Sequence, residues 1–355
     1  MTFNPLWTWA APAAACGIIG VWLLAPDLPF LPLLLVVGLL CGVLAAVHHA
    51  EVIALKVGEP FGTLVLALSI TTIEIALIVS MMLQGGKDVM ALPRDTLFAA
   101  VMIILNGIVG LSLLMGGRKN RVQTFNLEGT TDALCTISLI VVVSMVLPNF
   151  TGSADGIYTP MQLGFVALLT LGVFIAFTRF QTVLHRDYFV MEEPGSNDSH
   201  EVPDLRTSLV SLALLLVSLC AVVVSAKGIS PQLEALLGRS NAPPAMLGII
   251  IAAIVLLPEF GASVRAARAN RLQTSLNLAF GSAIASIGLT VPAVAVLALW
   301  MEWPLQWGLD GVSTILLTLT LFLVALSLRT GNTTRQPGAL HLALFAVFLF
   351  FNLVP

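Results

Sequence analysis

The sequence predicts an all-α polytopic membrane protein with about eleven transmembrane helices. Apolar residues make up 58% of the 355 residues and charged residues only 10%, whereas soluble domains carry about 25% charged residues. Mean hydropathy is +0.99. The apolar residues also form uncharged runs of about 20 residues, the length that a helix needs to cross about 30 Å of hydrocarbon. A water-soluble fold is therefore excluded.

Eleven such runs follow one another along the chain, and each is expected to form one helix. The runs are continuously apolar instead of alternating at every second residue, which favours helices over the strands of a membrane barrel. The predicted spans are residues 5–25, 29–50, 61–83, 95–116, 130–147, 160–180, 206–226, 243–264, 272–300, 308–328 and 338–354.

Basic residues predict how these spans are oriented, because cytoplasmic loops carry an excess of Lys and Arg. With these spans, twelve of the sixteen Lys and Arg residues fall on one face of the membrane. Only Lys87, Arg94, Lys227 and Arg239 fall on the other face. The N-terminus is therefore expected in the cytoplasm, and the C-terminus on the periplasmic or external side of the cell (inner) membrane.

One hydrophilic, acidic segment, residues 182–205, divides the chain near its middle. Residues 1–28 are expected to form an extra first helix, residues 29–181 a first repeat of five helices, and residues 206–355 a second repeat of five. Counterparts lie five spans apart, so the repeats would be inverted in the membrane, as in many secondary transporters. The linker is expected in the cytoplasm. It could be a solvated connection between the repeats or a weak cation-sensing segment, and both interpretations stay open.

Two glutamates lie inside otherwise apolar spans, where even a lenient insertion scale assigns an ionised residue a cost of about 2.5–3.5 kcal/mol. Glu74 lies in LALSITTIEIALI and Glu259 in LLPEFGAS, at corresponding places in the two repeats. Two carboxylates brought together would neutralise a divalent cation, or each could take a proton because burial disfavours the charged form. We therefore predict that Glu74 and Glu259 bind cation and protons alternately.

Further oxygen ligands are expected beside these acids, because Ca²⁺ takes about six to eight oxygens. The candidates are Thr71, Asn106, Ser282, Ser286 and the backbone carbonyl of Ile254. The carbonyl is a candidate because Pro258 has no N–H to donate to it. Two alternatives stay open: hydroxyls in membrane helices often bond their own backbone, and Asn106 could be a contact between helices.

Three further acids, Glu59, Glu128 and Asp132, lie at the cytoplasmic entrances of predicted helices. Carboxylates are favoured at helix N-termini by the helix dipole, so capping is the default interpretation. A role in proton or cation entrance or in gating is the alternative.

At these residues the chain resembles the ChaA-type calcium/proton antiporters of the calcium/cation antiporter superfamily. The similar stretches are GEPFGTLVLALSITTIEIALI, RDTLFAAVMIILNGIVGLSLLMGGRK, LLPEFGASVRAARANRLQTSLNLAFGSAIASIGLTVP and ALHLALFAVFLF. They place one motif at residues 59–116 and the other, more specific one at residues 254–292. The resemblance extends from about residue 50 to the end of the chain.

The resemblance implies two inverted repeats, each with an acid that binds the transported cation, and these acids match Glu74 and Glu259. It also places Ser282 in the Gly-Ser step of the second repeat and Asn106 in the comparable helix of the first. Many superfamily members carry Gly-Asn shortly before each acid, whereas residues 71–73 are Thr-Thr-Ile and residues 256–258 are Leu-Leu-Pro. We therefore expect the amide ligand and the helix break to be absent there.

These expectations describe a secondary active transporter that exchanges cytoplasmic Ca²⁺ for external H⁺. The alternative is a Na⁺(K⁺)/H⁺ antiporter that uses the same site. A cation channel would need a continuous pore, and an intramembrane enzyme is disfavoured because the sequence has no HExxH, Ser-Lys, paired-Asp or nucleotide-binding motif. No cofactor and no nucleic acid is expected; the partners are inorganic cations, protons and the lipid bilayer, and a homo-oligomer stays open.

Overall fold

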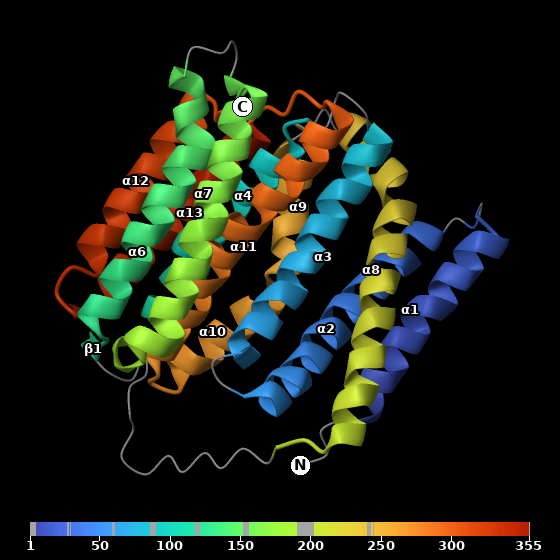
Figure 1. Ribbon diagram of the computed structural model, residues 1–355, viewed down its shortest axis with the longest axis horizontal. Helices are drawn as coiled ribbons and strands as arrows, with labels where there is room; N and C mark the ends of the chain where they lie inside the picture. Colours follow the sequence, from blue (N-terminus) through green and yellow to red (C-terminus); the bar gives the residue numbers. More distant parts are fainter. Residues whose placement is uncertain are drawn as a thin grey trace. The chain divides into compact units, whose positions relative to one another are not determined.

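The computed structural model describes residues 5–26, 28, 30–58, 61–85, 90–117, 121–151, 156–189, 202–239, 243 and 245–354. The described elements are helices, apart from one pair of two-residue strands (Figure 1). The all-α prediction is confirmed. The chain forms two compact units, Met1–Val89 with Gly195–Ala242 (unit 1) and Met90–Pro194 with Pro243–Pro355 (unit 2). Each unit takes helices from both predicted repeats, whose boundaries stay a prediction.

The number of membrane spans agrees with the prediction of about eleven. Within the described residues, nine helices are long and apolar enough to cross a membrane, and one bent pair of helices makes a tenth candidate. A shorter apolar helix of 17 residues, Gly311–Ser327, coincides with the predicted span 308–328. The protein is therefore a multi-pass membrane protein.

Unit 1 contains four helices: α1 (Leu6–Leu24), α2 (Leu31–Val57), α3 (Phe61–Gly85) and α8 (Leu205–Arg239). Helix α2 packs against the other three, and α3 also packs against α8. A Cβ atom added to Gly42 of α2 would lie 2.9 Å from Val222 Cγ2 of α8, so glycine permits this close approach. Helix α8 continues past the predicted end at residue 226.

The extra first helix is joined to α2 by a hydrogen bond that a proline makes available. Pro12 lies inside α1 and has no N–H, so the carbonyl of Thr8, four residues earlier, lacks its usual helical donor. The Nε2 atom of His49 on α2 lies 3.0 Å from this carbonyl oxygen. Both residues are fully buried, so the imidazole N–H satisfies a carbonyl that water does not reach.

Unit 2 contains the remaining spans, and π-helical or 3₁₀ turns interrupt several of them. The elements are α4 (Leu92–Met102), η2 (Ile103–Ile108), α5 (Val109–Gly116), β1 (Gln123–Thr124), α6 (Leu127–Val141), η3 (Val142–Val146), η4 (Leu147–Phe150), α7 (Pro160–Arg179), η6 (Phe180–Leu184), η7 (Arg186–Tyr188), α9 (Ala245–Val255), α10 (Leu257–Arg268), α11 (Leu272–Met301), α12 (Gly311–Ser327), β2 (Asn332–Thr333) and α13 (Arg335–Leu353).

Two contacts between loops in unit 2 show the pattern that inverted repeats produce. Strands β1 and β2 pair antiparallel, which joins the loop before α6 to the loop before α13. A single bridge between Ile157 and Gln306 joins the loop before α7 to the loop before α12. In the predicted repeats, α12 is the counterpart of α6 and α13 is the counterpart of α7. If each helix is replaced by its counterpart, the contact between the loops before α6 and α13 becomes the contact between the loops before α12 and α7. The two contacts lie at opposite ends of the unit (Figure 1).

The end of unit 2 that carries β1 and β2 is rich in arginine. Eight arginines lie at this end, which we name the arginine-rich end: Arg121, Arg179, Arg186, Arg265, Arg268, Arg271, Arg329 and Arg335. At the opposite end of unit 2, the described residues include one arginine, Arg94, at the start of α4. These arginines are among the basic residues from which the orientation was predicted, so the orientation stays a prediction.

The eighth span departs from the prediction, because residues 243–264 are not one continuous helix. Helix α9 ends at Val255 and α10 begins at Leu257, with an angle of 55° between them. Pro258 lies in the first turn of α10, and its ring excludes the carbonyl of residue 254 while its nitrogen offers no donor. The expectation that a helix break is absent before Glu259 was therefore wrong.

Candidate functional site

Glu74 lies in the interior of α3, in unit 1. Its side chain is only 4% exposed, and that of Thr71, one helical turn earlier, is 3% exposed. Residues three apart lie on one face of a helix, so the carboxylate and the hydroxyl share the buried face of α3. Thr72, by contrast, is exposed and donates its hydroxyl to the carbonyl of Leu68. The structure thus keeps Thr71 beside Glu74 as the sequence suggested.

Glu259 lies in the first turn of α10, immediately after the break, in unit 2. Its side chain is 7% exposed. The break leaves backbone N–H groups at the start of α10 and a helix dipole that favours a carboxylate there. Pro258 lies four residues after Ile254, where a helical N–H would bond the Ile254 carbonyl, but proline has no N–H to donate. The break therefore places a carboxylate beside backbone polar groups, a combination that a continuous helix does not offer.

The candidate serines lie on α11, which packs against α10. Ser286 is buried, with 5% of its surface exposed, and Ser282 is half-buried. They are four residues apart and lie on one face of α11. Glu259, Ser282 and Ser286 therefore belong to two helices in contact within unit 2, whereas Glu74 and Thr71 belong to unit 1.

A cluster of three serines, missed by sequence reasoning, lies one helical turn beyond Glu259 toward the arginine-rich end. Ser263 of α10 donates its hydroxyl to the backbone carbonyl of Ser275 on α11 at 3.0 Å. The Ser275 hydroxyl is 2.9 Å from that of Ser112 on α5. All three are at most 1% exposed. The cluster connects the helix of Glu259 to α5 and α11. The sequence signal that could have found it is the spacing of four between Glu259 and Ser263, which places both on one face of a helix.

Asn106 lies in the π-helical segment η2 and contacts two other helices. Its Nδ2 donates to Thr320 Oγ1 of α12 at 2.9 Å, and its Oδ1 lies 3.1 Å from His341 Nδ1 of α13. All three residues are fully buried. The contact between helices, the alternative to a ligand role, is therefore present. Because a carbonyl oxygen has two lone pairs, the Asn106 oxygen keeps one acceptor site beyond its bond to His341.

The candidate entrance residues have different surroundings. Glu128 is exposed in the first turn of α6, whose N-cap is Asn126, with Oδ1 accepting from Gly129 N at 2.9 Å. Asp132, one turn later, is half-buried. Capping of α6 thus falls to Asn126 and not to the two acids. Glu59 lies outside the described residues.

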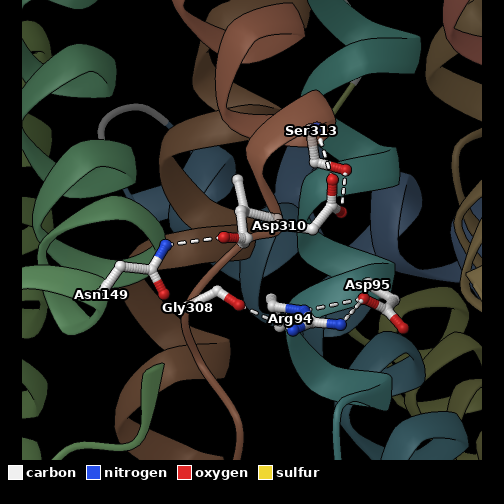
Figure 2. Close-up of polar contacts among 7 residues, drawn as sticks. Arg94, Asp95, Asn149, Gly308, Asp310 and Ser313 are labelled. Atoms are coloured by element: carbon white, nitrogen blue, oxygen red, sulfur yellow. Dashed lines mark hydrogen bonds and ion pairs between the residues drawn. The ribbon is translucent and has the colours of Figure 1, made fainter. Parts of the chain in front are cut away.

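A second polar cluster, also missed by sequence reasoning, closes the opposite end of unit 2 (Figure 2). Arg94 pairs with Asp95, with 2.7 Å between Nη2 and Oδ1, and donates through Nη1 to the Gly308 carbonyl at 2.7 Å. Asn149 donates to the next carbonyl, that of Leu309. A Cβ atom on Gly308 would lie 1.8 Å from Asn149 Oδ1. The loop before α12 is therefore fixed between α4 and the end of the fifth span.

Two groups in the loops of this end have shifted pKa values. Burial has the largest effect on the pKa of Asp310 and raises it, but hydrogen bonds from the side chain and backbone of Ser313 outweigh it, with help from Arg94 (Figure 2). The net result is a pKa below the ordinary value of 3.8. Burial also raises the pKa of Tyr158 to about 12. Asp310 therefore stays ionised as the N-cap of α12, and Tyr158 stays neutral.

Comparison with known sequences identifies relatives over nearly the whole chain. The pattern of the family described as sodium/calcium exchanger protein matches residues 28–183 and 210–354. A protein of Sinorhizobium fredii named as an ionic transporter, y4hA, is 43% identical over 357 residues, which cover 99% of this chain and 97% of that protein. The sodium-potassium/proton antiporter ChaA of Escherichia coli is 35% identical over 345 residues, 95% of this chain and 93% of that protein.

More distant similarities extend to proteins named for calcium. The Ca²⁺/H⁺ antiporter ChaA of Bacillus subtilis is 19% identical over 244 residues, 68% of this chain and 69% of that protein. Among solved structures, native YfkE has a TM-score of 0.76 at 15% identity and covers 98% of this chain and 100% of that chain. The H⁺/Ca²⁺ exchanger CAX has a TM-score of 0.70 at 16% identity, with coverage of 97% and 88%. These structures share the fold.

The family pattern matches both halves of the chain, and one relative is 35% identical along 95% of it. The chain therefore belongs to the sodium/calcium exchanger protein family, whose members are secondary transporters and not enzymes.

Proposed function

We propose that this membrane protein exchanges a monovalent cation, Na⁺ or K⁺, for H⁺, with Glu74 and Glu259 as the groups that bind the cation and the protons. Cation/proton antiport is the activity common to the named antiporters that it matches. The observation that carries the choice of cation is the 35% identity, over almost the full length of both chains, to the relative named a sodium-potassium/proton antiporter. The relatives named for Ca²⁺ are 19–23% identical.

The side chains of the described residues support the monovalent choice. Ca²⁺ favours about six to eight oxygen ligands, several of them carboxylates. No group of three or more His, Cys, Asp or Glu residues suited to a metal ion occurs in the part of the chain that the structure describes. The candidate ligands near Glu259, which are the hydroxyls of Ser282 and Ser286 and the Ile254 carbonyl, are neutral oxygens. Each of the two glutamates therefore has neutral oxygens as its candidate partners, which suits a singly charged ion that competes with a proton.

Exchange instead of leak follows from the burial of the two carboxylates. An ionised carboxylate in a low-dielectric surrounding is unfavourable, whereas the same group with a cation or a proton is nearly neutral. Both glutamates are more than 90% buried. We therefore expect the protein to change conformation when the glutamates hold a cation or protons, and not when they are empty and ionised.

The experiment measures proton movement in proteoliposomes with an imposed ΔpH, to which Na⁺, K⁺ and Ca²⁺ are added in turn. We expect Na⁺ or K⁺ to dissipate ΔpH and Glu259→Gln to lose this response. The matched control is Glu302→Gln, which removes one carboxylate from an exposed position at the end of α11. Dissipation by Ca²⁺ alone would instead support Ca²⁺/H⁺ exchange at the same glutamates, and no response to any cation would exclude antiport.

The same proposal places the protein in the bacterial inner membrane with the arginine-rich end of unit 2 in the cytoplasm. The excess of arginine at that end supports this orientation. Alkaline phosphatase fused after residue 355 should be active, because α13 runs away from the arginine-rich end. An inactive fusion with full-length expression would reverse the orientation.

A further inference from the structure

The contacts of Thr320 determine which way the buried amide of Asn106 points. The Thr320 hydroxyl lies 2.8 Å from the carbonyl oxygen of Leu316 and 3.4 Å from Met102 Sδ, and it donates its single proton to the carbonyl, the stronger and nearer acceptor. It can therefore only accept from Asn106, which makes the group 2.9 Å away the amide nitrogen Nδ2. The amide oxygen Oδ1 then faces α13. The amide oxygen and nitrogen are similar in size, so the orientation of the Asn106 amide is assigned from which partner donates and which accepts.

The orientation of Asn106 in turn determines the tautomer of His341. The Oδ1 atom of Asn106 lies 3.1 Å from His341 Nδ1 and can only accept, so Nδ1 carries the proton. In the neutral imidazole Nε2 is then an acceptor, and the Ser327 hydroxyl, 3.2 Å away, can donate to it. Every polar atom of the neutral imidazole is thereby satisfied.

The surroundings of His341 favour this neutral form, because they offer no counter-charge. Helix α13 packs mainly against α5, η2, α9 and α12, and its Phe348 also contacts Phe98 of α4. None of the first four segments contains an ionisable residue, and the charged residues of α4, Arg94 and Asp95, pair with each other in its first turn. On α13 itself the other ionisable side chain is Arg335, at its first position. A charge buried without a partner is strongly unfavourable. His341 therefore acts as a hydrogen-bonding group and not as a proton carrier.

Glycines hold the imidazole at a fixed position relative to η2. A Cβ atom on Gly110 of α5 would lie 2.9 Å from His341 Cβ, and one on Gly338 of α13 would lie 2.6 Å from the Gly110 carbonyl oxygen. The backbones of α5 and α13 are therefore in close contact at the turn that carries His341. Neither helix can slide past the other without opening this contact, so the backbone that carries His341 is fixed relative to α5.

From this network we propose that His341 is a positioning residue for Asn106 and for the π-helical segment η2. The segment η2 also packs against α10, which carries Glu259. The imidazole N–H fixes Asn106 with its amide oxygen toward α13 and stabilises η2 against α10. Outer partners of this kind typically change affinity about 10- to 100-fold when removed. The inference rests on the proposed antiport, which it deepens by naming a residue that acts on the Glu259 helix from a distance.

Two amide substitutions separate the two nitrogens of His341. In His341→Asn the amide nitrogen takes the place of Nδ1 and can still donate to Asn106, whereas in His341→Gln it takes the place of Nε2 and leaves Asn106 Oδ1 without its donor. We expect His341→Asn to keep the apparent KM for the cation within about two-fold, and His341→Gln to raise it about ten-fold. Equal losses in the two variants, or no loss in either, would overturn the proposal.

The control is Ser144→Ala, which removes another buried hydroxyl from unit 2. Ser144 is 1% exposed, and its Oγ has no hydrogen-bond partner among the described residues. Its loss should leave the KM unchanged. A change as large as that of His341→Gln would show that any buried polar loss in this unit has the same effect, and would also overturn the proposal.

A second readout does not depend on transport. Nitrogen NMR of the purified protein labelled at histidine, assigned with His341→Asn, should show a neutral imidazole with the proton on Nδ1 between pH 6 and 8. A proton on Nε2, or a charged imidazolium, in this range would contradict the inference even if antiport is confirmed. Absence of exchange in the wild-type protein together with the expected tautomer would reject the proposed function and leave the role of His341 in orienting Asn106 intact.

Discussion

Glu74 and Glu259 hold corresponding places in the sequence, but the helices that carry them differ. Helix α3 runs without interruption from Phe61 to Gly85, whereas the chain bends by 55° between α9 and α10 just before Glu259. The residue before Glu74 is Ile73, and the residue before Glu259 is Pro258. One proline therefore gives one acid a helix N-terminus and leaves the other inside a regular helix. Counterparts in two repeats need not have equivalent surroundings.

The largest effect expected from this comparison is the loss of exchange when either carboxylate is removed. Glu74→Gln and Glu259→Gln should each reduce cation-dependent proton movement to the level of protein-free vesicles, because each substitution removes a group that binds cation and proton. Proteoliposomes with an imposed ΔpH give the measurement. If one variant kept exchange, the acid in that helix would not be part of the mechanism and the asymmetry would be functional as well as structural.

The next effect tests the break itself. Pro258→Ala restores an N–H within reach of the Ile254 carbonyl and allows α9 and α10 to straighten, which should reduce exchange about ten-fold because the carboxylate of Glu259 is displaced. Ile73→Leu at the corresponding place in α3 should change exchange by less than about two-fold, since volume-conserving apolar changes are tolerated. Initial rates compare the two variants. Equal rates for Pro258→Ala and wild type would show that the break is not needed.

A stability effect of intermediate size is expected where α9, the first half of the broken span, meets α4. A Cβ atom on Gly248 would lie 2.8 Å from both the carbonyl carbon of Asp95 and the nitrogen of Thr96. Gly248→Ala should therefore lower the free energy of unfolding by about 1–3 kcal/mol. Gly164→Ala on α7, where nothing lies within 4 Å of the added atom, is the matched control. Thermal unfolding in detergent should show a lower Tm for Gly248→Ala only.

The smallest expected effect concerns the helix caps of the two predicted repeats. Asn126 caps α6 with a neutral amide, and Asp310 caps α12 with a carboxylate. Asp310→Ala should cost about 1 kcal/mol of stability, as losses of N-caps do. Because the folded protein holds the pKa of Asp310 below 3.8, its stabilisation is complete above that pH and is lost as the pH falls through the lower, folded value.

The cap prediction is checked by measuring unfolding at pH 7 and again at a pH well below 3.8, where the carboxyl of Asp310 is protonated in the folded protein too. The difference in Tm between wild type and Asp310→Ala should shrink on acidification, whereas the difference for Asn126→Ala should not, since an amide does not titrate in this range. A constant difference for Asp310→Ala would show that the carboxylate is not the capping group.

The sequence alone was sufficient for the spans, their class and the two acids. In a bilayer, the backbone N–H and C=O groups of a continuous apolar run of about 20 residues are satisfied when the run forms a helix. An acid inside such a run is conspicuous because burying its charge is unfavourable. The sequence did not predict which side chains contact each other or where a helix bends. The bend at Leu256 is an instance: a proline removes a donor, but neighbouring groups decide whether a membrane helix bends there, and the expectation of a continuous eighth span was wrong.

What the sequence determined, then, is the set of elements: an all-α membrane protein, Glu74 and Glu259 in apolar helices, and glycines where helices approach. Only the tertiary structure decided which elements meet. It placed Asn106 against Thr320 and His341, more than 200 residues away, and it joined Arg94 to the Gly308 carbonyl. The physical reason is that hydropathy and helical period act over a few residues, whereas a buried hydrogen bond depends on the packing of helices that are far apart in the chain.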